Sequence, residues 1–336
     1  MKKLPLLSII VVTYNSEGVI SSCLNHIKKQ NYNSYEAIVV DNASSDTTLR
    51  ILSNYSWIKL IKNAKNLGFS KANNQGIQQA SGDFILLLNP DAFATSSSLK
   101  TLIYYIQSDS SLGFVCPKLL KPGKKHIIDS TGIQATPERR FFDRGRLEID
   151  KSQYDKQTNI FAGCGAALLL RKKALEDIKI DKEYLDEDFF AYLEDVDLCW
   201  RMRLRGWKGA YCPKALVYHQ RGHDLARHDT LPFFTFLRQR LFRLKKPSDS
   251  FIRRLSFRNS FWILLKNDSL CGISLDFFHI SFYWCKRLIY ILFIEPYVFL
   301  EFPVLIRRIP RMLKKRKLII KSRLVQPLEL RKFFKS

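Results

Sequence analysis

Short apolar runs in the first part of the sequence are each followed by a polar segment whose side chains could do chemistry. These segments are Thr13-Tyr14-Asn15, residues 41–46 (DNASSD) and Asn89-Pro90-Asp91. Carboxylates serve as general bases and as ligands of divalent cations. One such segment alone is more typical of an ordinary turn or a helix cap. Three of them in succession favour a binding site.

More acids begin a predicted helix in the second half of the chain. The helix should end near Gly206. Its apolar face consists of residues at 3-4-4-3 spacing, namely Leu193, Val196, Trp200, Leu204 and Trp207. Three acids in its first turn point away from that face, namely Glu194, Asp195 and Asp197. Asp197 could pair with Arg201 four residues later, and the helix dipole also favours first-turn acids. His219 ends a further apolar segment, residues 215–218.

Alternating apolar runs and helical segments must position these side chains. The predicted strands are residues 8–12, 37–40, 57–61 and 84–88, and the predicted helices are residues 19–27, 47–54 and 71–80. Buried strands that alternate with helices predict an α/β fold with a doubly wound, mostly parallel sheet. Because ligands bind at the carboxyl ends of the strands in such sheets, the polar segments should meet in one site.

A polar stretch, residues 120–160, separates the two halves and contains Pro122-Gly123 and Arg139-Arg140. Its length predicts a mobile active-site loop or a small subdomain. The small residues at 162–167 that follow it allow close approach of the backbone, or tight packing beneath a strand.

Six segments resemble, in order and spacing, the inverting glycosyltransferases of family 2, which have the GT-A fold. They are SIIVVTYN (8–15), VVDNASSD (39–46), NLGFSKANNQGI (66–77), LLLNPDA (86–92), FFAYLEDVDLCWRMRLRGW (189–207) and VYH (217–219). The set is most similar to the rhamnosyltransferase branch. The resemblance implies transfer of a sugar from a dTDP- or UDP-linked donor to a cell-surface polysaccharide or a lipid-linked acceptor. Rhamnose is the first candidate, followed by galactose or N-acetylglucosamine.

The resemblance also implies a donor site at the matching residues. The nucleotide would be lined by Thr13, Tyr14 and Asn15. Asp41 would accept a hydrogen bond from the pyrimidine base. The rest of the donor pocket would be shaped by Asn66, Gly68, Asn74 and Asn89.

A divalent metal and a general base are implied in the same way. Asp91 and His219 would bind Mg²⁺ or Mn²⁺, which neutralises the charge of a departing diphosphate. The family's metal motif is often Asp-x-Asp, whereas its first position here is Asn89. Asp195 would be the general base for the acceptor hydroxyl, with Glu194 beside it. Its place at a helix N-terminus should lower the pKa of Asp195.

Most of the positive charge lies in the C-terminal third. Of the net charge of +24, residues 226–336 contribute +17, from 24 Lys and Arg against 7 Asp and Glu. Such an excess indicates a phosphate-rich partner, either an anionic membrane or a nucleic acid. We predict a catalytic domain at residues 1–225 and a helical, basic and aromatic extension at residues 226–336.

Within this extension, residues 277–306 are rich in aromatic and aliphatic side chains. Their longest uncharged run is the nine residues 277–285, whereas a membrane-spanning helix needs about 20, and Pro296 and Pro303 should interrupt a long helix. Nine of the 17 residues at 307–323 are Lys or Arg. The pattern predicts amphipathic segments that lie on an anionic membrane surface. The alternative is a helical subdomain packed on the catalytic domain, with a solvated basic tail.

Three other classes of protein fit the sequence less well. A nicotinamide-dependent dehydrogenase should have G-x-G-x-x-G after its first strand, where this chain has TYNSEG (13–18). The basic residues from Arg238 onward form no recognisable nucleic-acid motif, so no specific nucleic acid is expected. A catalytically inactive family member is disfavoured by the joint presence of Asp41, Asp91, Asp195 and His219.

The cysteines and the N-terminal residues indicate the cellular compartment in which the protein is expected. Seven widely spaced cysteines include no C-x-x-C pair and indicate neither a disulfide framework nor a zinc site. The apolar N-terminal stretch is interrupted at Thr13-Tyr14-Asn15 and lacks a small-residue cleavage site. We therefore expect a cytoplasmic protein at the inner face of the cell membrane.

Overall fold

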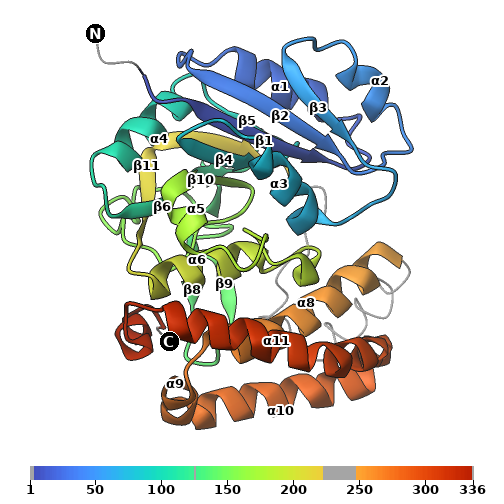
Figure 1. Ribbon diagram of the computed structural model, residues 1–336, viewed down its shortest axis with the longest axis vertical. Coiled ribbons are helices and arrows are strands. Elements are labelled where there is room, and N and C mark those ends of the chain that lie inside the picture. Colours follow the sequence, from blue (N-terminus) through green and yellow to red (C-terminus); the bar gives the residue numbers. More distant parts are fainter. Residues whose placement is uncertain (1–3, 125, 222–246, 335–336) are drawn as a thin grey trace.

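A mixed β-sheet forms the centre of the first two thirds of the chain in the computed structural model, which describes residues 4–124, 126–221 and 247–334 (Figure 1). Its strand order is β3-β2-β1-β4-β10-β6-β11-β5, with β7 beside β6. The strands are β1 (Leu7–Thr13), β2 (Tyr35–Asp41), β3 (Ile58–Lys62), β4 (Phe84–Leu88), β5 (Ala92–Ala94), β6 (Leu112–Leu120), β7 (Ile128–Ser130), β10 (Ala167–Arg171) and β11 (Lys208–His219). Strands β5, β7 and β10 run antiparallel to their neighbours. The others are parallel to one another, which confirms the predicted mostly parallel sheet.

Helices cover both faces of the sheet, as a doubly wound fold requires. One face packs against α1 (Ile20–Lys28), α2 (Thr48–Leu52) and α4 (Ser98–Gln107). The other packs against α3 (Phe69–Gln78), α5 (Lys172–Asp177) and α6 (Glu194–Leu204). Because successive side chains of a strand point to opposite faces, Ile9 and Val11 of β1 lie in one core and Ile10 in the other.

The three polar segments meet because the strands before them are parallel and in register. Thr13 at the end of β1 pairs with Asp41 at the end of β2, and Val11 pairs with Leu88 at the end of β4. The chain therefore leaves three neighbouring strands at one edge of the sheet, as predicted. Residues 120–160 add a small subdomain with β7 and the two-stranded sheet of β8 (Ile133–Ala135) and β9 (Phe141–Asp143).

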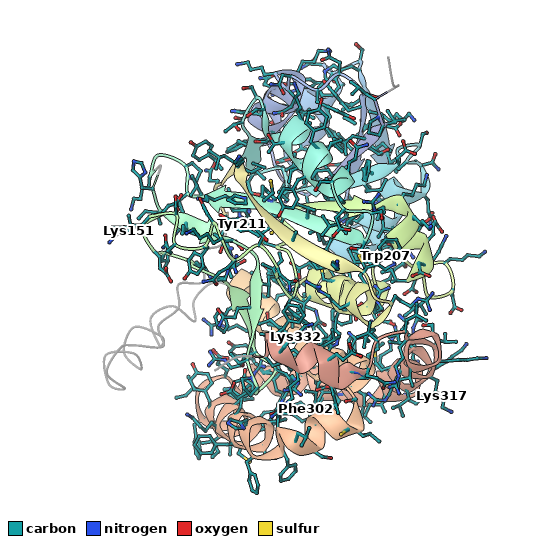
Figure 2. The ribbon with its side chains drawn as sticks, turned by 90° about the vertical axis from the view of Figure 1, so that its left-hand side faces the viewer. Lys151, Trp207, Tyr211, Phe302, Lys317 and Lys332 are labelled. Atoms are coloured by element: carbon teal, nitrogen blue, oxygen red, sulfur yellow. The ribbon has the colours of Figure 1, made fainter. Side chains whose placement is uncertain are left out.

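The C-terminal region is a layer of helices beneath the sheet, seen from two directions in Figures 1 and 2. It contains α8 (Pro247–Asn267), α9 (Leu270–Leu275), α10 (Phe277–Ile294), α11 (Phe302–Ser322) and the short 3-10 helices η2 (Pro296–Glu301) and η3 (Pro327–Phe333). Trp262 of α8 and Met312 of α11 belong to the same hydrophobic core as α6. These two helices therefore match the alternative of a packed subdomain. The predicted domain boundary at residues 225–226 lies outside the described residues.

Helix α10 is different, because it lies on the side of α8 and α11 that faces away from the sheet (Figure 1). Lys286 and Arg287 do not interrupt it, and it ends just before Pro296. By length and composition alone it could cross a membrane, with a mean hydropathy of 1.3 over 18 residues, of which 11% are buried. Its outward side chains are mostly apolar and exposed.

Candidate active site

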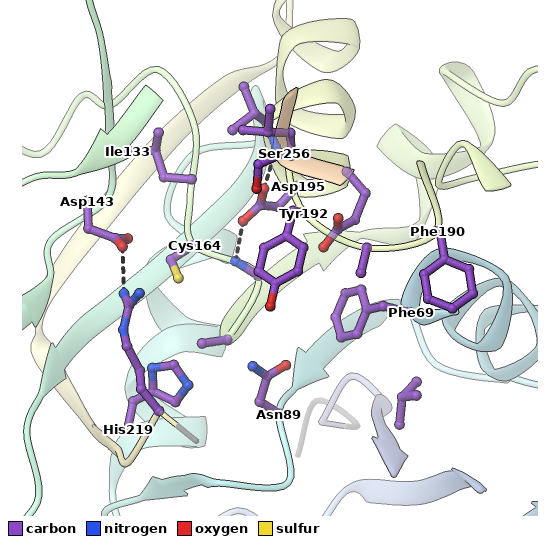
Figure 3. A pocket seen from close by; sticks show the side chains of 18 of the residues that line it. Phe69, Asn89, Ile133, Asp143, Cys164, Phe190, Tyr192, Asp195, His219 and Ser256 are labelled. Carbon is purple, nitrogen blue, oxygen red and sulfur yellow. Dashed lines mark hydrogen bonds and ion pairs between the residues drawn. The ribbon is translucent and has the colours of Figure 1, made fainter. Parts of the chain in front are cut away.

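A cavity of about 1030 Å³ opens at the carboxyl ends of the central strands (Figure 3). Most of the predicted site residues line it, namely Tyr14, Asn15, Asn66, Gly68, Asn89, Asp91, Glu194, Asp195 and His219. Thr13, Asp41 and Asn74 are buried behind its wall. The cavity is also lined by Ser256 of α8 and by Tyr283 and Arg287 of α10, none of which the sequence had indicated.

Thr13 and Asp41 shape the turn that follows β2. The Thr13 hydroxyl donates a hydrogen bond to Asp41 Oδ1 at 2.9 Å. Ser44 donates to the same carboxylate from its hydroxyl at 2.6 Å and from its backbone N–H at 3.0 Å. Asp41 thus fixes the turn beside Tyr14 and Asn15, and its contact with a nucleotide base stays a prediction.

Asn74 links α3 to the segment that precedes α6. Its side-chain amide donates to the Leu185 carbonyl at 2.8 Å and accepts from the Leu185 N–H at 2.9 Å. This pairing of one side chain with both backbone groups of Leu185 fixes the segment that leads to α6. Asn74 is therefore buried outside the cavity and supports the backbone that forms the cavity wall.

Asp91 and His219 come together as predicted. His219 Nε2 lies 3.3 Å from Asp91 Oδ1, and its Nδ1 lies 2.8 Å from Oδ2 of the buried Asp129. Burial would lower the pKa of His219, but the hydrogen bonds to Asp129 and Asp91 raise it to about 9. Arg221 also donates to Asp129, at 2.6 Å, and holds that carboxylate in place.

Once His219 has lost the proton that it shares with Asp91, this arrangement suits a divalent cation with few protein ligands. A carboxylate that orients a histidine through Nδ1 is the usual outer partner of a metal-bound imidazole. Asn89 adds a buried side-chain oxygen, Oδ1, which has no hydrogen-bond partner among the described residues. Those residues contain no group of three or more His, Cys, Asp and Glu that could hold a metal. Asp91, His219 and Asn89 would thus need diphosphate oxygens to complete a metal site.

Asp195 faces the cavity from the first turn of α6. Its Oδ2 accepts a hydrogen bond from the Gly165 N–H at 2.8 Å, and a Cβ atom at Gly165 would lie 3.3 Å from the carboxylate. The small residues at 162–167 therefore allow the close backbone approach that their size predicted. Burial raises the pKa of Asp195 to about 6. The expected lowering by the helix N-terminus is wrong, because desolvation outweighs it.

Glu194 lies beside Asp195 and is the more deeply buried of the pair. Burial and the neighbouring Asp195 carboxylate raise the pKa of Glu194 well above its usual value. Its Oε2 has no hydrogen-bond partner among the described residues. At neutral pH Asp195 is therefore the group of the two that is ready to accept a proton.

The backbone before α6 is strained. Phe190, Tyr192 and Leu193 have φ angles of 64°, 71° and 68°, a left-handed region that is costly for side chains of this size. The side-chain amide of Asn259, on α8, donates to the carbonyls of Ala191 and Tyr192, both at 2.8 Å. A residue of the C-terminal region thus holds the segment that presents Asp195.

Buried ion pairs connect the same elements. Lys266 of α8 contacts Asp197 at 2.7 Å and Asp186 at 2.5 Å, and Lys315 of α11 contacts Asp186 at 2.5 Å. The predicted pair of Asp197 with Arg201 is present at 3.0 Å. Part of the C-terminal positive charge therefore neutralises acids of the catalytic domain and is unavailable to an external partner.

The comparison with known families decides the identity. The model of the family described as "Glycosyl transferase family 2" matches residues 8–179, just over half of the chain. This chain belongs to glycosyl transferase family 2. The resemblance to this family is thereby confirmed, with four of the six segments inside the matched range, and the protein is a glycosyltransferase.

The transferase is similar to several named relatives. It is 27% identical over 229 residues to the low-salt glycan biosynthesis hexosyltransferase Agl10 of Haloferax volcanii, covering 67% of this chain and 70% of that protein. It is 26% identical over 238 residues to the rhamnosyltransferase WbbL of Escherichia coli, covering 68% and 86%.

Solved structures show the same fold. The mannosyltransferase PcManGT of Pyrobaculum calidifontis, in complex with GDP-Man and Mn²⁺, has a TM-score of 0.52 at 14% identity and covers 96% of the transferase and 86% of its own chain. Residues 1–349 of Staphylococcus aureus TarS, in complex with UDP, have a TM-score of 0.51 at 20% identity, with coverages of 80% and 83%.

Proposed function

We propose that the transferase moves a sugar from a dTDP- or UDP-linked donor to a saccharide or lipid-linked acceptor, with inversion at the anomeric carbon. One observation carries the proposal: Asp195 faces the same cavity as Asn15, Asp91 and His219. A base and a site for a diphosphate therefore share one space. Displacement from the face opposite the leaving group, assisted by that base, inverts the sugar.

The printed names of similar proteins support the choice of donor. WbbL is a rhamnosyltransferase, and rhamnose is accordingly the first candidate sugar. UDP occupies TarS and GDP-Man occupies PcManGT, which supports a nucleotide-linked donor. A carboxylate such as Asp41 can accept the N3–H of uracil or thymine, whereas cytosine has no such proton. With a rhamnosyltransferase among the named relatives, we favour a uridine- or thymidine-linked donor over a cytidine-linked one.

In the proposed mechanism Asp195 accepts the proton of the acceptor hydroxyl as that oxygen attacks the sugar. The Gly165 and Val196 N–H groups hold the carboxylate at 2.8 Å each, so it is oriented before the acceptor arrives. Asp91, His219 and Asn89 would hold Mg²⁺ or Mn²⁺, and the Mn²⁺ of PcManGT supports this choice. When bound, such an ion would neutralise charge on the departing diphosphate.

The membrane association proposed for the C-terminal region is supported by α10. Its outward face exposes large apolar side chains, among them Phe278, Phe282, Ile289 and Phe293. Exposed basic residues of α11, including Arg307, Lys314 and Lys317, provide charge for anionic headgroups. We propose that the transferase is peripheral at the cytoplasmic face of the cell membrane, with α10 in the interface.

Two experiments test these proposals. A screen of dTDP-rhamnose, UDP-galactose, UDP-N-acetylglucosamine and GDP-mannose for release of nucleoside diphosphate should single out a pyrimidine donor. Preference for GDP-mannose would contradict the nucleotide assignment.

For the membrane, flotation should show binding to vesicles that contain phosphatidylglycerol, with release as salt rises. The double variant Phe278→Ser/Phe282→Ser should lose binding. Tyr104→Ser/Ile149→Ser is the control, because these side chains are also large and exposed but belong to the catalytic domain. Equal binding by both double variants would exclude α10 as the contact.

A further inference from the structure

Helix α10 has two sides with different chemistry. Its outward side is apolar, with Phe278 83% and Phe293 74% exposed. Its inward side contributes Tyr283 and Arg287 to the cavity that contains Asp195. One helix thus connects an apolar outer surface directly with the catalytic cavity.

Arg287 is held by aromatic rings instead of by acids. Its guanidinium carbon lies 5.1 Å from the ring centre of Phe257 and 5.4 Å from that of Trp284. Its Nη1 donates to the Tyr283 hydroxyl oxygen at 3.2 Å. No carboxylate among the described residues forms an ion pair with it. Its guanidinium is therefore oriented by the aromatic rings and by Tyr283, and not by an acid of the part of the chain that the structure describes.

Two other arginines of the cavity wall, Arg139 and Arg221, form ion pairs with buried acids. Arg139 contacts Asp268 at 2.7 Å and Asp276 at 2.9 Å. Arg221 contacts Asp129 and Asp143. Unlike these two, Arg287 has no acidic partner in residues 4–124, 126–221 and 247–334, and it lines a cavity of an enzyme with anionic substrates. A stacked guanidinium keeps its N–H groups available for two parallel hydrogen bonds to a phosphate.

The C-terminal helices contribute Ser256, Tyr283 and Arg287 to the cavity wall. In the view of Figure 3, Asp195 and Tyr192 lie between Ser256 of α8 on one side and Asn89 with His219 on the other. The metal and diphosphate of the donor belong to the side of Asn89 and His219. Ser256 places the C-terminal helices on the opposite side, and we infer that the acceptor approaches Asp195 from there.

We propose that Tyr283 and Arg287 form an acceptor subsite for the phosphate or diphosphate of a lipid-linked saccharide. This inference rests on the proposed function and names its acceptor class. The guanidinium of Arg287 binds the phosphate, and the Tyr283 hydroxyl, which accepts from Arg287, donates its own proton to a second phosphate oxygen. The lipid chain leaves over the apolar side of α10, and the sugar beyond the phosphate reaches Asp195.

A binding experiment tests the subsite without requiring the correct sugar. Calorimetry would use farnesyl diphosphate as the probe, with farnesol and inorganic diphosphate as its two halves and excess UDP to fill the nucleotide site. The full chain should bind farnesyl diphosphate more tightly than either half. Arg287→Gln should weaken that binding about 10- to 100-fold, as for a lost charge-assisted hydrogen bond.

Lys286→Gln is the matched control, because Lys286 is the adjacent cation on the same helix but is exposed and does not line the cavity. It should change the affinity by less than about twofold. Arg287→Lys keeps the charge and should retain part of the affinity, which excludes misfolding as the cause of the loss. Equal losses in Arg287→Gln and Lys286→Gln, or no loss in Arg287→Gln, would overturn the subsite. Failure of the proposed function would appear separately, in the nucleotide-sugar screen.

Discussion

Lys266 on α8 lies 2.7 Å from Asp197 on α6, two residues beyond Asp195, and neither side chain of the pair is exposed to solvent. The same ammonium contacts Asp186 at 2.5 Å. A helix of the basic C-terminal region is thus joined by buried charge to the helix that carries Asp195, the proposed base. Helix α8 consequently helps to hold α6 in place, independently of any contact that α10 makes outside the protein.

The first prediction follows from this pair. Lys266→Met removes the ammonium that neutralises the buried carboxylates of Asp186 and Asp197. The free energy of unfolding should therefore fall by about 3–5 kcal/mol. Urea denaturation measures this change. Lys317→Met, on the exposed side of α11, should change it by less than about 0.5 kcal/mol. Similar stability of the two variants would show that the buried cluster does not connect the helices.

The second prediction concerns the strained segment before α6. Asn259→Ala removes the amide that binds the Ala191 and Tyr192 carbonyls, so Asp195 should be less well positioned. We expect kcat to fall about 10²-fold while affinity for the nucleoside diphosphate stays unchanged. Ser274→Ala removes a hydrogen bond within α9 and serves as the control. An unchanged kcat in Asn259→Ala would mean that the segment keeps its geometry without the amide.

The third prediction concerns the metal. Asp91→Ala should lose most turnover, and EDTA should abolish activity that added Mn²⁺ restores. Asp129→Asn keeps the shape of the residue behind His219 but weakens its hold on Nδ1, so the Mn²⁺ concentration for half activation should rise about 10- to 100-fold. Full activity in excess EDTA would exclude the metal, and an unchanged Mn²⁺ requirement in Asp129→Asn would exclude this orienting role.

Much of the fold follows from local patterns. The runs before Thr13, Asp41 and Asn89 are apolar enough to be buried strands, and their parallel register brings the segments together. The direction of β10 was not predictable, because an apolar run such as ALLLR (167–171) is the same in a parallel or an antiparallel strand.

Parts of the site depend on contacts between residues that are far apart in the chain. The spacing of apolar residues in the sequence does not predict such contacts. Asp129 and His219 are 90 residues apart in the chain, and Asn259 lies 67 residues beyond Tyr192. The sequence does contain a weak indication of Asp129, since an acid beside the apolar pair Ile127-Ile128 is out of place unless it has a buried partner. For Asp41, the motif predicted the position, but not that Thr13 and Ser44 would occupy its oxygens.

The role of Asp195 as general base is tested most directly by the pH dependence of nucleoside diphosphate release from the preferred donor. A base works only when deprotonated, and the pKa of Asp195 is raised to about 6. The rate should therefore be constant above about pH 7 and should fall about tenfold for each pH unit well below 6. Asp195→Asn should lower kcat by about 10²- to 10⁴-fold and remove this acid limb. The account is contradicted if Asp195→Asn keeps the rate and the acid limb, or if Glu194→Gln is the variant that loses them.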